Sequence, residues 1–139
     1  MKTARAALAA VAALVSLGAG VAYRTGPPPG HTGAFGEPDC GACHFDAPRD
    51  DPDGAARLDA PGVYVPGERY DLTVTVRHRG LGAAGFQLAA RFLEGDRAGR
   101  QAGVLEPMGA GTRVEVGENG VAYVSHTRDG VAPDVPAEE

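Results

Sequence analysis

Two cysteines and a histidine stand at a spacing that can do chemistry. Cys40 and Cys43 are separated by two small residues, and His44 follows directly. This C-x-x-C-H spacing is typical of c-type haem attachment, in which each thiol adds to a porphyrin vinyl group and the histidine becomes the proximal iron ligand. The chain has only two cysteines and four histidines, so composition alone makes the arrangement improbable. The sequence therefore predicts one covalently bound haem c.

Three other interpretations of the cysteine pair stay open: a plain disulfide, a redox-active dithiol, or half of a zinc site. A zinc site needs two further ligands, and the chain has no second C-x-x-C. A thioredoxin-like dithiol needs a βαβ context, which the surrounding sequence does not offer. The disulfide is the strongest of the three alternatives.

The opposite side of the iron needs a second ligand, and four residues of suitable type are candidates. These are His31, His78, Met108 and His126. His126 ends an expected strand, where an inward-facing histidine is hard to explain by packing alone; a capping or surface histidine is the alternative. We expect bis-histidine ligation by His44 and His126, with Met108 and His78 as alternatives. Two imidazoles leave the iron no open position, which favours electron transfer at low potential, whereas a His/Met pair would raise the potential.

The haem-binding residues are expected on loops and short strands rather than in a helical bundle. No stretch after the first 22 residues shows a sustained helical period. The clearest strand covers residues 70–78, where apolar and polar residues alternate. Further strands are expected over residues 56–58, 86–92, 103–106, 112–116 and 121–126, with Gly-containing turns between them. This pattern predicts an all-β antiparallel sandwich with an N-terminal haem-binding loop.

The first 22 residues have the layout of an export signal. Lys2 and Arg5 precede an apolar run over residues 6–22, and small residues at 20–22 suit cleavage before Tyr23. An uncleaved membrane-anchor helix is the alternative, because the run is near the lower limit for a bilayer span. We therefore expect a periplasmic, extracellular or cell-surface protein that contacts a membrane only through such an anchor.

The chain is expected to divide into four segments. Residues 1–22 form the signal or anchor, 23–36 a Pro/Gly-rich linker, 37–127 the haem-binding β-sandwich domain, and 128–139 a flexible acidic tail. The net charge of −5 becomes −7 when the two basic residues of the leader are removed. No basic patch remains that would bind nucleic acid. The acidity suits solubility and would attract a positively charged redox partner.

Four pieces of the sequence, in order, resemble one family. They are Cys40–His44, Tyr-Val-Pro-Gly-Glu-Arg-Tyr-Asp-Leu-Thr-Val at 64–74, Gly-Phe-Gln-Leu at 85–88, and Tyr-Val-Ser-His-Thr at 123–127. The order resembles the Reeler-like domains of secreted bacterial proteins, also described as choice-of-anchor domains. The resemblance spans residues 34 to 127 and implies an immunoglobulin-like sandwich. Such domains usually end in a further aromatic strand, whereas this chain has no Trp, and a missing edge strand would expose unpaired backbone groups.

Two functions remain open from the sequence. The first is a monohaem electron-transfer cytochrome that exchanges electrons with partner proteins. The second is a non-redox adhesion or interaction module, in which a disulfide between Cys40 and Cys43 closes a loop. Catalysis is less expected than electron transfer, because the chain has no nucleophile motif and no phosphate-binding loop.

Overall fold

The computed structural model describes residues 23–45 and 48–131. In this part of the chain the regular structure consists of strands and short 3-10 turns, with no α-helix. For these residues, the prediction of an all-β fold is therefore confirmed. The predicted leader and all but the start of the predicted tail lie outside the described residues. Among the residues described, no helix has the length and apolar character that crossing a membrane requires.

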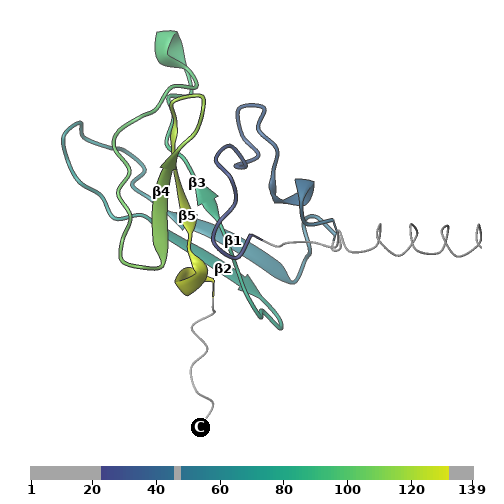
Figure 1. The fold of residues 1–139 in the computed structure, drawn as a ribbon. Coiled ribbons are helices and arrows are strands. Elements are labelled where there is room, and N and C mark those ends of the chain that lie inside the picture. Colours follow the sequence, from purple (N-terminus) through teal and green to yellow (C-terminus); the bar gives the residue numbers. More distant parts are fainter. Residues whose placement is uncertain (1–22, 46–47, 132–139) are drawn as a thin grey trace, which may run out of the picture.

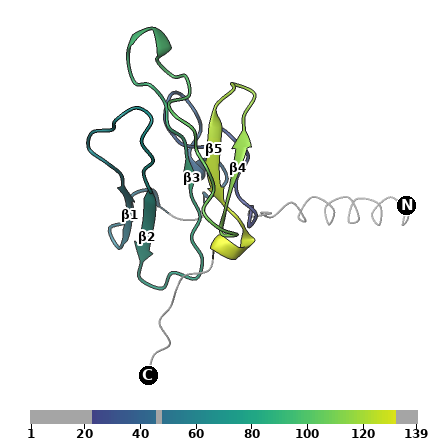
Figure 2. The ribbon, with the colours of Figure 1, turned by 90° about the vertical axis from the view of Figure 1, so that its left-hand side faces the viewer.

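The strands form two antiparallel sheets. In the first, β1 (Gly54–Asp59) pairs with β2 (Thr73–His78). In the second, β5 (Ala122–His126) lies between β3 (Gln87–Leu88) and β4 (Thr112–Val116) (Figure 1). Figure 2 shows the β1–β2 pair on one side and the β3–β5–β4 sheet on the other. Three 3-10 turns, η2 (Cys40–Ala42), η3 (Gly95–Arg97) and η4 (Arg128–Gly130), lie in the connections.

The first sheet presents one apolar face. Ala56 lies opposite Val76, and Leu58 lies opposite Val74. Side chains of directly opposed residues stand on the same side of a sheet, so these four form a continuous apolar surface. Every β1 residue is exposed, which means that this face lacks the tight cover of a closed core.

The core belongs to the second sheet, around its central strand. Val121, Tyr123 and Val124 are buried, and so are the polar residues Ser125 and His126. β5 is paired along both edges, so its backbone groups are satisfied while its side chains are covered. The two buried polar side chains therefore need partners within the protein.

Most predicted strands are present, with changed limits. The predictions for 112–116 and 121–126 are confirmed by β4 and β5, and that for 56–58 by the longer β1. The strand predicted over 70–78 begins only at residue 73, which is paired with the last residue of β1. The one predicted over 86–92 shortens to two residues plus an isolated bridge, Arg91–Gln101. Residues 103–106 form no strand.

The Pro/Gly-rich segment from residue 23 lies against the second sheet. Gly26 is buried with φ +100, and a Cβ on it would lie 2.6 Å from the backbone oxygen of His126. A side chain at this position would therefore meet both backbone strain and a clash. The Arg113 guanidinium donates to the Gly26 carbonyl at 3.4 Å. The segment is thus fixed to the sheet along its first residues.

Candidate functional site

The cysteine motif is folded as a single tight turn. The Cys40 carbonyl accepts the backbone N–H groups of Cys43 at 3.2 Å and of His44 at 2.9 Å. Asp39 caps the turn, because its Oδ1 accepts the Gly41 N–H at 2.8 Å. In a helical turn, residues three and four apart lie on the same side. Both cysteines are free thiols, and all three motif residues are exposed, so the turn offers two thiols and an imidazole together.

Arg49 closes the loop that follows this turn. Its guanidinium donates to Asp39 Oδ2 at 2.7 Å. The guanidinium also packs on Gly41, where an added Cβ would lie only 2.8 Å from the Arg49 nitrogens. The Arg49 and Asp39 side chains are 70% and 42% exposed, so the ion pair adds little stability. Its effect is local: it holds the chain after the motif against the cap residue.

A cleft of about 380 Å³ lies beside the motif, between the two sheets. Its apolar lining comes from both sheets: Ala56, Leu58, Val74, Val76, Phe86 and Leu88. Cys40 and His31 also line this cleft. The volume lies within the range of ordinary small-molecule sites, which are mostly apolar with a few polar groups at defined places. The cleft can therefore hold an apolar ligand, with Cys40 and His31 among the residues around it.

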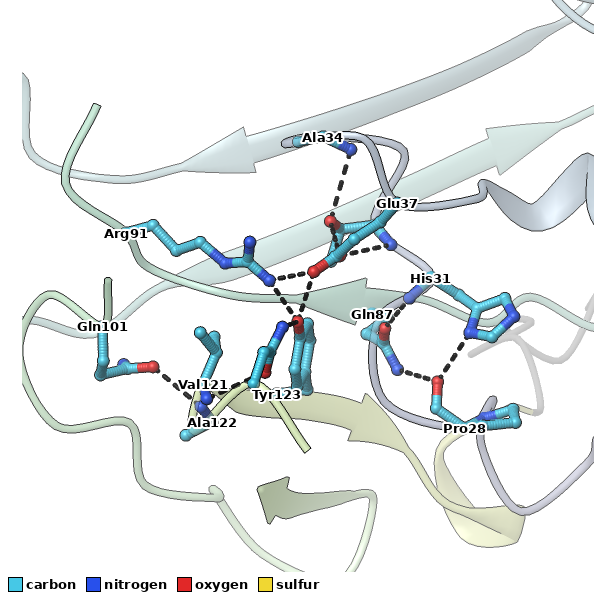
Figure 3. A network of polar contacts seen from close by, with 12 residues as sticks. Pro28, His31, Ala34, Glu37, Gln87, Arg91, Gln101, Val121, Ala122 and Tyr123 are labelled. Carbon is cyan, nitrogen blue, oxygen red and sulfur yellow. Dashed lines mark hydrogen bonds and ion pairs between the residues drawn. The ribbon is translucent and has the colours of Figure 1, made fainter. Parts of the chain in front are cut away.

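His31 presents one ring nitrogen that makes no hydrogen bond to any described residue. Its Nδ1 lies 3.0 Å from the Pro28 carbonyl oxygen. A carbonyl can only accept, so Nδ1 carries the proton and Nε2 carries the lone pair. Among the described residues, Nε2 has no hydrogen-bond partner. The backbone N–H of His31 donates to Gln87 Oε1 at 2.6 Å, and Gln87 Nε2 donates to the Pro28 carbonyl at 2.9 Å (Figure 3).

His126, by contrast, uses both ring nitrogens for the backbone. Its Nε2 lies 3.2 Å from the Tyr23 carbonyl oxygen, and its Nδ1 accepts the Phe86 N–H at 3.0 Å and lies 3.3 Å from the Phe86 carbonyl oxygen. The ring packs on Gly85, where a Cβ would lie 2.4 Å from the imidazole Cε1. His126 is buried and is not part of the cleft lining. Iron ligation by His126 stays a prediction, and the role visible in the structure is that of a buried structural histidine.

The other two candidate ligands lie away from the cleft lining. His78 is at the exposed end of β2, with its Nε2 3.6 Å from Asp51 Oδ2. Met108 is 66% exposed, and its backbone N–H donates to the Thr112 hydroxyl at 2.8 Å. The structure thus brings His31 and Cys40 to one cleft and leaves the other three candidates outside its lining.

A buried charged network holds the loop that leads into the motif. The Arg91 guanidinium contacts both the Glu37 carboxylate and the Tyr123 hydroxyl, and that hydroxyl also donates to Glu37 (Figure 3). The Thr32 hydroxyl donates to the second carboxylate oxygen at 2.6 Å. The Arg91 and Glu37 side chains are 7% and 10% exposed. The network therefore ties residues 32–37, just before the cysteine turn, to β5 of the second sheet.

The charges in this network are set by its geometry. Burial raises the pKa of the Glu37 carboxyl, but hydrogen bonds from Thr32, Tyr123 and Arg91, with the Arg91 charge, outweigh burial and bring the pKa below its usual 4.5. Burial and the neighbouring carboxylate of Glu37 raise the pKa of Tyr123 above its usual 10.0. At neutral pH the network thus contains one carboxylate, one guanidinium and a neutral phenol.

Sequence reasoning missed the parts played by Gln87 and Arg91. In the expected strand 86–92, Phe86 and Leu88 alternate with polar residues, and that apolar face is the one that lines the cleft. Gln87, which also lines the cleft, and Arg91 bind residues 28–37. The signal was present as two long polar side chains four positions apart within the strand expected over 86–92.

Within residues 23–45 and 48–131, no three His, Cys, Asp or Glu side chains gather as they would around a bound metal ion. Comparison of the chain with protein-family models, curated proteins and solved structures gave no match. The cleft and the cysteine turn are therefore the features of this chain that bear on its function.

Proposed function

We propose that this chain is an exported monohaem c-type cytochrome that transfers electrons. The observation that supports it most is the apolar cleft of about 380 Å³ that opens beside Cys40 of the C-x-x-C-H turn. A binding motif without a cavity would have nowhere to shelter a porphyrin. A cavity without the motif would have no means of holding one covalently.

The residues of the cleft fit the chemistry of a haem. The porphyrin plane is apolar, and removing its surface from water contributes roughly 25 cal/mol per Å². Leu58, Val74 and Phe86 provide apolar cover from two sheets. Arg57 also lines the cleft and supplies a guanidinium of the type that pairs with carboxylates such as the haem propionates.

Cys40 and Cys43 would hold the haem through two thioether bonds, one from each thiol to a vinyl group, and this addition consumes no oxidant. His44, which follows directly, would bind the iron. When bound, the haem supplies a one-electron redox couple. A second protein ligand would close the remaining position, which favours electron transfer over oxygen chemistry.

The same proposal sets the location, the partners and the finer fold. Bacterial c-type haem is attached outside the cytoplasm, which agrees with the export signal expected in residues 1–22 and places the protein in the periplasm or at the cell surface. Redox proteins are the expected partners. For the fold, we propose a Reeler-type, immunoglobulin-like sandwich, supported by two antiparallel sheets that line opposite sides of one cleft.

The proposal is tested with full-length protein made in a bacterial host that carries the c-type maturation machinery. We expect the denatured protein to stain for haem on a gel, to gain the mass of one haem, and to show a reduced-minus-oxidised cytochrome spectrum. The matched control is the double variant Cys40→Ser, Cys43→Ser, which should lose all three signals. Colourless wild-type protein from cells that mature a second, known cytochrome would overturn the proposal.

A second candidate, an exported interaction module without haem, is favoured by one observation. Four apolar residues of the β1–β2 connection are exposed: Val63, Tyr64, Val65 and Tyr70. Exposed apolar patches often mark protein–protein contacts. If this second candidate is correct, the denatured wild-type protein would not stain for haem on the gel. Alkylation followed by mass measurement would then find Cys40 and Cys43 joined as a disulfide.

A further inference from the structure

We infer that His31, rather than His126, is the second axial ligand of the iron. The inference rests on the proposed function, because it assigns the second ligand of that same haem. It replaces the ligand expected from the strand pattern with one that the geometry of the cleft selects.

The first argument is position. Of the four candidates for this ligand, His31 alone lines the cleft that Cys40 also lines. A haem attached through Cys40 and sheltered in this cleft would therefore have the His31 imidazole beside it. His126 would have to leave its place against Gly85 before its ring could enter the cleft.

The second argument is the state of the imidazole. Ligating histidines commonly donate one ring N–H to a backbone carbonyl, which fixes the tautomer and leaves the other nitrogen to bind the metal. His31 has this arrangement, with Nδ1 bonded to the Pro28 carbonyl and Nε2 carrying the lone pair. Both ring nitrogens of His126 are occupied by the backbone: Nε2 lies beside the Tyr23 carbonyl, and Nδ1 lies beside both the N–H and the carbonyl of Phe86. Of these two histidines, His31 has the ring nitrogen that can bind a metal without breaking a hydrogen bond among the described residues.

The third argument is rigidity. Gln87 bonds both to the His31 N–H and to the Pro28 carbonyl that orients the His31 ring (Figure 3). Gln87 also donates to the Ser125 hydroxyl at 3.2 Å, which connects the clamp to the buried β5 strand. Ligand and orienting carbonyl are therefore positioned by one side chain that is itself anchored in the core. A ligand held in this way binds its metal with little further ordering.

The test compares His31→Ala with the matched control His126→Ala, both produced as full-length protein in the maturation-competent host. We expect His31→Ala to keep its covalent haem on the gel, to lose the low-spin spectrum of the wild type, and to gain binding of carbon monoxide in the reduced state. Added imidazole should restore the low-spin spectrum, which a merely structural role of His31 would not explain. His126→Ala should keep the wild-type spectrum.

A second variant, His31→Met, covers the case in which His31→Ala does not fold. Methionine can still ligate, and a His/Met pair raises the reduction potential. A potential above that of the wild type supports the assignment, and an unchanged potential overturns it. Covalent haem with an unchanged spectrum in His31→Ala, or loss of the low-spin spectrum in His126→Ala, also overturns it while leaving the proposed function intact. Wild-type protein without haem overturns both.

Discussion

Removing the Arg91 guanidinium should strongly destabilise the fold. In Arg91→Leu, the Glu37 carboxylate keeps its burial, with 10% of its side chain exposed, but loses its counter-charge. Breaking a buried ion pair from one side costs about 3–5 kcal/mol. We expect about 3 kcal/mol, at the lower end, because the hydroxyls of Thr32 and Tyr123 still donate to the carboxylate. The substitution also removes the cation–π contact of Arg91, whose guanidinium carbon lies 5.0 Å from the centroid of the Phe35 ring.

The assay is urea unfolding of purified full-length protein, followed over a range of pH. In the wild type the pKa of Glu37 is lowered in the folded state, so its stabilisation is present above pH 4.5 and is lost as the pH falls through the folded pKa. In Arg91→Leu, burial acts with less opposition, so the pKa of Glu37 should lie above its wild-type value and the variant's carboxyl should become protonated first as the pH falls. The difference between the two proteins should therefore be constant near neutral pH and shrink as the pH falls toward and below 4.5.

The control is Arg69→Leu, which removes another arginine and another ion pair. Arg69 and its partner Glu106 lie 2.9 Å apart, with side chains 80% and 58% exposed. Exposed pairs contribute about 0–1 kcal/mol. The reasoning is refuted if Arg91→Leu costs less than about 1 kcal/mol at pH 7, or if its deficit stays constant with acidification.

Two further predictions concern the histidines and the glycine beneath one of them. Gly85→Ala should lower the free energy of unfolding by about 1–3 kcal/mol, because the new Cβ would lie 2.4 Å from the His126 ring. The control is Gly82→Ala, where the new Cβ meets open space. It should change the free energy of unfolding by less than about 0.5 kcal/mol in the same urea assay. Nitrogen NMR of haem-free protein at neutral pH should find the Nδ1–H tautomer for His31 and the Nε2–H tautomer for His126; a shared tautomer would contradict the hydrogen bonds described above.

The sequence was most informative where local pattern decides structure. β4 and β5 lie where short stretches between Gly-containing turns indicated strands, because glycine-rich turns end a strand locally. The strand expected from Tyr70 starts only at Thr73, since β1 ends at Asp59 and offers no partner beyond it. Pairing length is a property of two strands together, and a single stretch of sequence does not contain it.

The cleft and the choice of ligand depended on tertiary structure. His126 lies within the region of the family resemblance, and His31 lies just before it. Because both are histidines, residue type alone does not say which is the better ligand. What separates them is which carbonyl lies beside which nitrogen, and those carbonyls belong to Pro28 and Tyr23. The Pro/Gly-rich segment has the composition of a linker, yet it is hydrogen-bonded to Gln87 through the His31 N–H and the Pro28 carbonyl. The sequence of the segment alone does not reveal these contacts.

The attachment of residues 23–26 to the second sheet has a mechanical consequence. The Tyr23 carbonyl is held by the His126 ring, and the Gly26 carbonyl by Arg113. A pulling force applied to the chain before residue 23 must load these two anchors before it reaches His31. If the expected N-terminal segment tethers the protein to a surface, tension on the tether would be carried by the β-sheet, and the cleft would keep its shape under load.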